Sequence, residues 1–379
     1  MIGLILNIFI YFYYKTLDKK NKKIIFLGIA FAMGILAFSY YRIDNSGDVT
    51  RYLLQYKNMS TEKFIIDEYN KNYLLWYLFI YNLKKYNLNF QILNFICIFI
   101  IYYINLFVVL EQNLEEKYEK KLVLKTLLYY SFALLFSSYR GTLCFSLAML
   151  GIFFLIKDIK IKGYIFFILS ILIHPIGYAI IIIYFLSLFI NISVIKKRLI
   201  LLFSLLLGFL NKNIIIFISK LLLSKNKFYS EKIDTYLIGN WSKYNFENRG
   251  EVLSYLIIFI LYSFIIIYFL KSKAWEQMNK KYINFIFLYL VISLNFITFR
   301  TIFYRLSHDG FLFFLPLFSC YLKEEKKKKI SYIILVVFWC LLIDYRNILY
   351  ILGFYKETFY IDMDFLIPYK YLKNIYMHF

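Results

Sequence analysis

The chain has few of the residues with which soluble enzymes hold metals, nucleotides or disulfide frameworks. It contains three histidines and four cysteines. The cysteines show no paired spacing and all lie in apolar stretches, so we interpret them as small core residues. These are Cys97, Cys144, Cys320 and Cys340. A glycine-rich phosphate loop, a zinc-binding histidine pair, a Ser-His-Asp order and a calcium loop are all missing, so we expect neither a metal nor a cofactor.

Acidic residues are also scarce. The sequence has 23 Asp and Glu against 45 Lys and Arg, which gives a formal net charge of +22. The basic residues fall in short loops between apolar runs and form no continuous groove-binding helix or aromatic-studded sheet, so we expect no nucleic acid partner. The enrichment of Lys and Arg in the cytoplasmic loops of membrane proteins accounts for this charge.

Apolar residues make up 61% of the 379 positions and aromatic residues 22%. A soluble domain of this size cannot bury that much apolar surface. Runs of roughly 17 to 25 apolar residues between Lys clusters are what a bilayer about 30 Å thick requires of its helices. We therefore predict an all-α, polytopic helical membrane protein with about 12 transmembrane helices, or roughly 10 to 13.

The expected helices cover residues 1–14, 24–41, 90–110, 126–136, 141–156, 163–174, 177–190, 199–219, 252–270, 282–299, 310–322 and 330–344. The first run lacks a basic leader and a small-residue cleavage site, which indicates a retained helix rather than a signal peptide. No linker or internal repeat divides the chain, so we predict one integral membrane domain over residues 1–379.

Lys and Arg are about three times as frequent in one set of loops as in the other, which predicts the sidedness. The basic set is expected in the cytoplasm and comprises residues 15–23, 111–125, 157–162, 196–198, 271–281 and 323–329. The outer segments are then 42–89, 220–251 and 349–379. Residues 72–86 are apolar enough to cross, but a crossing would invert every later loop. We predict an interfacial or re-entrant helix over 73–83 on the outer face, with Trp76, Tyr77 and Tyr81 at headgroup depth.

The outer segment opens with polar residues released directly from an apolar run, in the stretch YYRIDNSGDVTRYLLQY over 40–56. Asp48 stands between Arg42 and Arg51, and Tyr52 follows one helical turn later. Charged and aromatic side chains in this mixture favour a sugar or phosphate ligand. A solvated loop with an internal salt bridge is the alternative.

Arg140, in SSYRGTLCFSLAML, lies between two apolar runs that leave no room for an ordinary loop. Ser137, Gly141, Cys144 and Ala148 recur at spacings of four, three and four, which lets another helix approach closely. Arg140 is therefore expected at the outer edge of a tight helix contact. An arginine that reaches to lipid headgroups or helix-end carbonyls is the alternative.

His174 precedes Pro175 and Gly177, which break the helix and free backbone groups that are tolerated only inside protein or beside a wet cavity. A histidine there can accept or donate a proton near neutral pH. The alternative is a structural histidine that caps the break.

Arg300 and Arg305 flank a short turn before His308 and Asp309. Two guanidiniums at one helix end can grip a diphosphate, although each can instead pair with Asp309 or with lipid phosphate. His308 beside Asp309 argues little for a joint role, because adjacent helical residues face different ways. Aromatic residues in 220–251 suit sugar stacking or interfacial anchoring.

In their order and spacing, these motifs resemble the EpsG family, which is related to the Wzy-type polysaccharide polymerases of bacterial inner membranes. The pieces that carry the resemblance are Arg42 with Gly47, Asp48 and Tyr52; region 67–94; Arg140 in SSYRG; His174 with Pro175; Arg305 in FYRLSH; and Pro368 with Tyr369. The chain departs from the pattern at Val49, Gly141, Thr142 and Gly177, beside the Arg and His positions but not at them.

The resemblance implies a GT-C-like architecture and a metal-independent glycosyltransferase in the bacterial inner (cytoplasmic) membrane. It would polymerise polyprenyl-diphosphate-linked oligosaccharide repeat units on the outer face, into a capsular, exo- or O-antigen polysaccharide, with a chain-length regulator as a further partner beside membrane lipid. Arg140 and Arg305 would stabilise the leaving diphosphate, and His174 or Asp48 would act as the base. Arg42, Arg300 and Tyr52 would contact the substrate.

Three other functions fit the same residues. A ligase that moves a finished glycan onto a lipid or protein, as O-antigen ligases do, uses the same donor. A flippase or transporter of lipid-linked sugars would place its charges along a midplane path between repeated halves. A structural partner of a synthesis complex would need no site.

Overall fold

The computed structural model describes the middle of the chain most completely. The described residues are 19–38, 40–42, 48–60, 70–112, 119, 123, 132–223, 225–243, 262–263, 265–267, 269, 278–317 and 359–361. The predicted helices 1–14 and 330–344, and most of 252–270, lie outside them.

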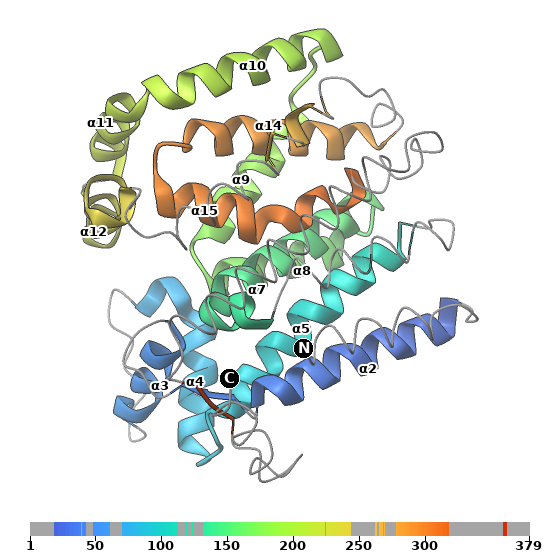
Figure 1. The fold of residues 1–379 in the computed structure, drawn as a ribbon, viewed down its shortest axis with the longest axis vertical. Coiled ribbons are helices and arrows are strands. Elements are labelled where there is room, and N and C mark those ends of the chain that lie inside the picture. The colour runs from blue at the N-terminus through green and yellow to red at the C-terminus, as the bar shows by residue number, and fades with distance from the viewer. Residues whose placement is uncertain are drawn as a thin grey trace, which may run out of the picture.

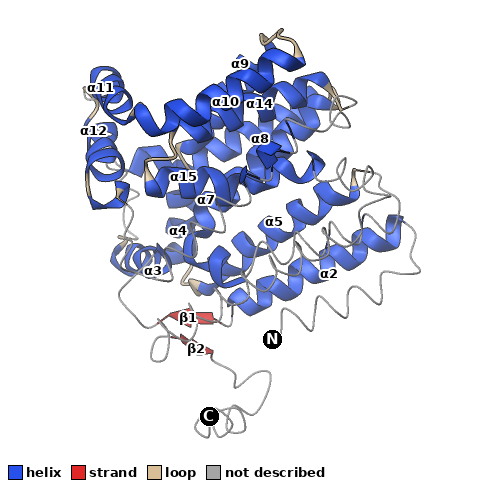
Figure 2. Cartoon of the chain, turned by 45° about the horizontal axis from the view of Figure 1, so that its top comes forward, coloured by secondary structure: helices blue, strands red, loops and turns tan. Residues whose placement is uncertain are grey.

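Helices dominate the described part of the chain (Figure 1). In chain order the elements are α2 (Lys19–Phe38), β1 (Tyr40–Arg42), α3 (Asp48–Asn58), η2 (Asn70–Tyr73), α4 (Leu74–Lys85), α5 (Gln91–Leu110), α7 (Phe132–Ile156), α8 (Lys160–Ile173), α9 (Ile176–Leu188), α10 (Val194–Leu210), α11 (Lys212–Leu223), α12 (Lys227–Ile233), η3 (Asp234–Ile238), η4 (Asn240–Ser242), α14 (Lys280–Asn295), α15 (Arg300–His308), η6 (Asp309–Phe314) and β2 (Phe359–Ile361). The helical fold class is therefore confirmed, apart from one short antiparallel pairing of β1 with β2 (Figure 2).

Within the described residues, three helices are long and apolar enough to cross a membrane: Asn21–Phe38, Gln91–Leu110 and Tyr139–Ile156. The bent pair α10 and α11 makes a fourth if it counts as one span. Helices α8 and α9 have 14 and 13 residues, fewer than the roughly 20 that a straight span requires. The count of twelve spans and the GT-C-like architecture stay predictions.

Helices α2 and α5 pack antiparallel. Lys23 Nζ lies 3.6 Å from Glu111 Oε1 at one end of the pair, and the Phe31 ring lies 5.4 Å from that of Phe95 toward the other. Gly34 permits the contact, since a Cβ there would come within 2.9 Å of the Phe95 ring. The chain between α2 and α5 therefore begins and ends at the same end of the pair, and α4 lies within it. This arrangement agrees with a segment 72–86 that does not cross.

Helix α7 corrects one prediction. We expected two helices, over 126–136 and 141–156, with Arg140 between them. The structure instead has one helix, Phe132–Ile156, that runs straight through Arg140. The sequence SSYRG has no proline, and its single glycine costs a helix only about 1 kcal/mol relative to alanine, which does not end it.

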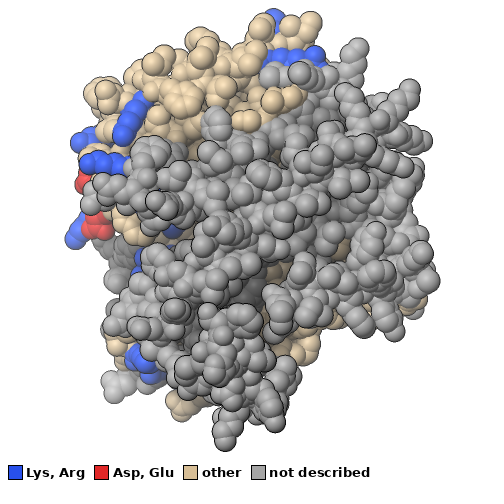
Figure 3. All heavy atoms as spheres, viewed as in Figure 1, with Lys and Arg blue, Asp and Glu red and all other residues tan. Residues whose placement is uncertain are grey.

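A second correction concerns the predicted helix 199–219. The chain bends by 83° between α10 and α11. The break lies at Asn211, one residue before the Lys212 that we read as an interruption, and Asn211 Nδ2 donates to Asn295 Oδ1 at 2.6 Å. The outward surface over α10 is largely apolar, with basic groups at its two ends (Figure 3), as expected of a helix that faces lipid.

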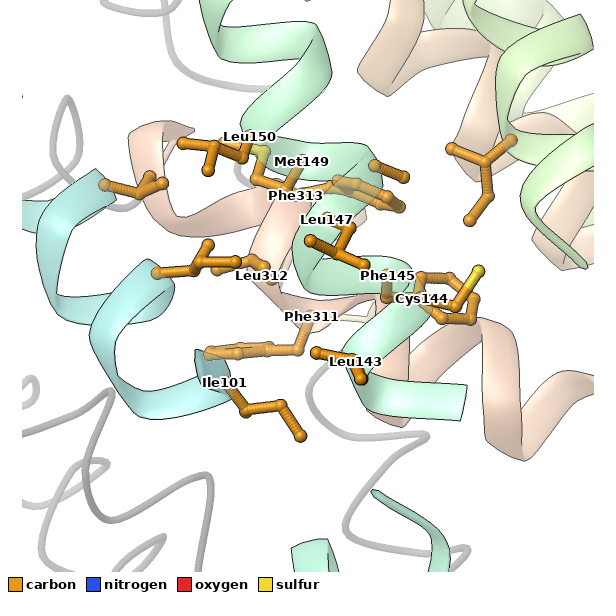
Figure 4. Packing of buried hydrophobic residues seen from close by; sticks show 14 of the residues in the cluster. Ile101, Leu143, Cys144, Phe145, Leu147, Met149, Leu150, Phe311, Leu312 and Phe313 are labelled. Atoms are coloured by element: carbon orange, nitrogen blue, oxygen red, sulfur yellow. The ribbon is translucent and has the colours of Figure 1, made fainter. Parts of the chain in front are cut away.

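Helix α7 packs closely against η6. Side chains of α7, among them Leu143, Phe145 and Met149, interleave with Phe311 and Phe313 of η6 (Figure 4). The Phe145 and Phe313 rings lie 5.7 Å apart. This contact places the end of α15 and the start of η6 directly against the arginine-bearing helix.

The predicted cytoplasmic and outer segments separate to opposite ends of the bundle. At one end the predicted cytoplasmic segments join in ion pairs: Lys22 with Glu119 (3.4 Å), Lys23 with Glu111 (3.6 Å), Lys157 with Glu111 (2.8 Å) and Lys281 with Asp158 (3.7 Å). At the other end lie α3, α4, α11 and α12 (Figure 1). There the Tyr73 ring lies 6.0 Å from the Phe228 ring, which joins two predicted outer segments.

Candidate functional site

Arg140 lies in a cage of aromatic rings at the end of the bundle that carries α3 and α4. Its Cζ lies 4.1 Å from the centre of the Tyr73 ring, 5.0 Å from that of Tyr52 and 5.6 Å from that of Trp76. The residue is 6% exposed, and among the described residues its Nε has no hydrogen-bond partner. Ring faces attract a cation but accept none of its hydrogen bonds in the guanidinium plane. The cage therefore leaves the buried Nε–H of Arg140 without a hydrogen bond among the described residues.

The rings of this cage are themselves packed together. Tyr52 contacts Trp76 edge-on at 4.8 Å, and Trp76 contacts Tyr139 at 5.7 Å. The Tyr139 hydroxyl donates to Asn94 Oδ1 at 2.8 Å, which ties the cage to α5. Trp76 and Tyr77 are only 1% and 5% exposed. Both side chains are therefore buried within the bundle, where Trp76 faces Arg140, and their place at headgroup depth stays a prediction.

His174 marks the predicted break between α8 and α9. Its backbone is extended (φ −155°, ψ 135°), and Pro175 follows as the N-cap of α9. Gly177 is required next, since a Cβ there would lie 2.9 Å from the backbone nitrogen of Ile171. The backbone N–H of Ile176 donates to His174 Nδ1 at 3.2 Å. The histidine does cap the break, as one of the two interpretations held.

Four cations surround the half-buried His174. Burial is the main cause that lowers the pKa of its imidazole well below the usual value, and the charges of Arg140, Arg305, Lys232 and Arg51 lower it further. These cations come from α7, α15, α12 and α3. The structure therefore brings together the predicted residues Arg140, His174 and Arg305.

Aromatic rings continue from the cage to Arg305. The Tyr73 ring lies 5.4 Å from the His174 ring and 6.0 Å from that of Phe228. Arg305 Cζ lies 5.3 Å from the centre of the Tyr236 ring, and Lys232 Nζ lies 5.6 Å from it. One surface of cations and rings thus passes from α7 over His174 to α15.

Comparison with known protein families gives this arrangement a context. A family model described as the EpsG family matches residues 24–371. The chain belongs to the EpsG family. This is a family of Wzy-type polysaccharide polymerase-like proteins, so the chain has a membrane polysaccharide polymerase-like, glycosyltransferase-like role. A search of curated proteins finds no match, and a search of solved structures finds none either.

The other predicted site residues of this EpsG-family protein lie apart from the centre or are placed by backbone alone. Arg300 is the first residue of α15 and is not among the four cations that act on His174. Residues five apart on a helix are rotated by about 140°, so Arg300 and Arg305 face different sides. Arg42 ends β1 opposite Phe359. Asp48 begins α3, one turn before Tyr52 and on the same face of the helix.

Asp309 is a residue of the site that sequence reasoning missed. It is 2% exposed, accepts from Thr142 Oγ1 at 3.2 Å and lies 3.0 Å from His308 Nδ1. The expectation that the side chains of His308 and Asp309 face different ways is therefore wrong. The α-helix ends at His308 and a 3₁₀ segment starts at Asp309, so the two side chains need not diverge. Gly141 makes room, since a Cβ there would lie 3.2 Å from Asp309 Oδ2.

Tyr73 and Lys232 were also missed. Tyr73 contacts both Arg140 and His174, and Lys232 lies one turn after the Phe228 that Tyr73 touches. Neither belongs to a motif, and only the alternation of aromatic and basic residues in the outer segments hinted at them. Within the described part of the chain, no group of three or more His, Cys, Asp and Glu is arranged to hold a metal ion.

Proposed function

We propose that this EpsG-family protein is a metal-independent glycosyltransferase of the bacterial inner (cytoplasmic) membrane. It joins polyprenyl-diphosphate-linked oligosaccharide repeat units into a capsular, exo- or O-antigen polysaccharide on the outer face. The observation that carries the proposal is the cluster of Arg140, Arg305, Lys232 and Arg51 around His174. This cluster lies at the end of the bundle where the predicted outer segments meet.

A diphosphate leaving group suits this cluster. Arginine binds phosphate oxygens bidentately, and pre-placed positive charge stabilises the negative charge that develops as the leaving group departs. The ring cage holds the guanidinium of Arg140 and leaves its Nε–H without a hydrogen bond among the described residues. These side chains can supply, without a metal, the charge that a diphosphate needs.

The reaction follows from this placement. A hydroxyl of the acceptor repeat unit attacks the anomeric carbon of the donor, and the bond from that carbon to the diphosphate oxygen breaks with its electron pair on the diphosphate. The acceptor proton goes to a base, for which Asp48 and His174 are the candidates. Tyr52, Arg42 and Arg300 are proposed to contact the substrate, and the polyprenyl chain lies along the apolar outer surface of the helices.

Aromatic residues beside Arg305 are suited to hold the sugar. Trp241 is 53% exposed, and its ring lies 6.2 Å from that of Tyr236, which in turn contacts Arg305. Thr301 Oγ1 donates to the Trp241 carbonyl at 2.7 Å, which fixes this platform to α15. Rings stack on the apolar faces of sugars, so the platform supports a saccharide next to the diphosphate.

Reconstitution tests the proposal. The purified protein in proteoliposomes, given only lipid-linked repeat units, should make longer oligomers. The double variant Arg140→Ala and Arg305→Ala should stop chain extension while it inserts and folds. Lys157→Ala, which removes one positive charge at the opposite end, serves as the matched control and should extend normally. Product of wild-type length from the double variant would refute the role of the two arginines.

The same assay separates the alternatives. A ligase would transfer glycan only when a separate lipid or protein acceptor is supplied. A flippase would move labelled sugar across the membrane without new glycosidic bonds. The clustering of the site's cations at one end, rather than along a midplane path, favours the enzyme.

A further inference from the structure

His174 is held so that only one of its ring nitrogens can face a ligand. The backbone N–H of Ile176 donates to Nδ1 at 3.2 Å. A nitrogen that accepts a hydrogen bond carries no proton, and a neutral imidazole has one N–H, so the proton must be on Nε2. Among the described residues, the hydrogen bond that reaches the His174 ring is the one at Nδ1.

The surroundings hold the ring in this orientation. The His174 backbone N–H donates to the Ser170 carbonyl at 3.0 Å, and its own carbonyl accepts from Gly177 N at 2.9 Å and from Cys144 Sγ at 3.6 Å. The Tyr73 ring packs edge-on at 5.4 Å. Turning the imidazole over would place a C–H against the Ile176 N–H and lose that bond. The fold therefore keeps Nδ1 of His174 as a hydrogen-bond acceptor.

The other route to a reactive base is also closed. A lone pair on Nε2 requires a proton on Nδ1, which would then face the Ile176 N–H donor to donor. The doubly protonated form would add positive charge among Arg140 of α7, Arg305 of α15, Lys232 of α12 and Arg51 of α3, which keep its pKa low. Two further titratable side chains contact His174: Cys144 at its carbonyl and Tyr73 at its ring.

We propose that His174 acts as a neutral hydrogen-bond donor, through Nε2–H, to an oxygen of the leaving diphosphate, and not as the general base. This inference rests on the proposed function and assigns a role within it. As the anomeric C–O bond breaks, its electron pair moves to the diphosphate, where Nε2–H and the arginines meet the growing negative charge. The proton of the acceptor hydroxyl then goes to a base other than His174.

Two substitutions separate a donor from a base. In His174→Gln the amide N–H reaches the position of Nε2 and can donate, but it cannot take a proton at neutral pH. We expect this variant to keep oligomer formation within about tenfold of the wild type, and His174→Ala to lose about 100-fold, as for other removed oxyanion donors. A glutamine variant as inactive as the alanine variant would overturn the donor role.

The pH profile gives an independent readout. If another group is the base, the acid-side midpoint of the pH–rate profile should be the same in the wild type and in His174→Gln. If an acid limb of the wild-type profile is absent from the glutamine variant, His174 is the base and the proposal is wrong. Loss of a residue that only positions the substrate would lower the rate without moving this midpoint.

Nitrogen NMR of ¹⁵N-histidine-labelled protein in nanodiscs tests the tautomer without turnover. The sequence has only three histidines, and His174→Gln assigns the signal. At pH 7 we expect Nδ1 to be unprotonated and Nε2 to carry the proton, and inorganic diphosphate to shift the Nε2–H signal. The opposite tautomer, an imidazolium or an unmoved signal would overturn the inference. Because this measurement needs no polymer, its failure is distinct from failure of the proposed function.

Discussion

The two ends of this helix bundle treat positive charge in opposite ways. At the end with the predicted cytoplasmic loops, Lys23 and Lys157 both pair with Glu111, and Lys281 pairs with Asp158. At the other end, Arg140 and Arg305 lie over aromatic rings. A carboxylate neutralises the cation that it pairs with, whereas the rings around Arg140 leave its positive charge in place. This difference supports the proposal that the end with the ring-bound Arg140 holds the site.

Exchanging arginine and lysine at each end should give the largest contrast in the rate of oligomer formation. Arg140→Lys keeps the charge but loses the planar fork that stacks on Tyr73 and binds phosphate bidentately, so we expect a loss of about 100-fold in oligomer formation. Lys157→Arg at the paired end should keep both the ion pair with Glu111 and full activity. Initial rates in proteoliposomes measure both. Equal tolerance at the two ends would break the comparison.

Removing one ring from the cage should have a smaller effect. Tyr73→Leu keeps much of the apolar volume but removes the ring face 4.1 Å from Arg140. A cation–π contact contributes about 0.5 to 2 kcal/mol, so we expect roughly a 2- to 30-fold loss of rate. Tyr73→Phe keeps the ring and is the control. If the leucine and phenylalanine variants have the same rate, the ring does not position the arginine.

Breaking the ion pairs should affect stability and not activity. Glu111→Gln removes the partner of Lys23 and Lys157, and each such pair contributes about 0.2 to 1 kcal/mol, less at high salt. The midpoint temperature of thermal unfolding should therefore fall slightly at low salt, and oligomer formation should be unchanged. Asp158→Asn, whose carboxylate is 76% exposed, is the control and should hardly change. A large loss of activity in Glu111→Gln would show that this end also serves the reaction.

Several parts of the site were predictable because they follow from local chemistry. Pro175 and Gly177 predict the break at His174. An arginine in an apolar stretch is energetically costly, which marks it as a functional candidate. Arg140 within a continuous helix was not predictable, since nothing in SSYRG distinguishes a turn from helix without its packing. The bond between His308 and Asp309 was missed for a related reason, as it depends on a change from α to 3₁₀ geometry between the two residues.

By itself the sequence determined the helical membrane class and the separation of basic loops from the outer segments. It also singled out Arg140, His174 and Arg305 as candidate site residues. Composition and spacing suffice for these because lipid forces backbone groups into helices and charge into predictable places. Only the tertiary structure decided that Tyr73, Tyr52 and Trp76 enclose Arg140, that Asp309 lies against Gly141, and that the Ile176 N–H occupies Nδ1 of His174. Those contacts join residues distant in sequence or depend on ring orientation, and both are set by packing.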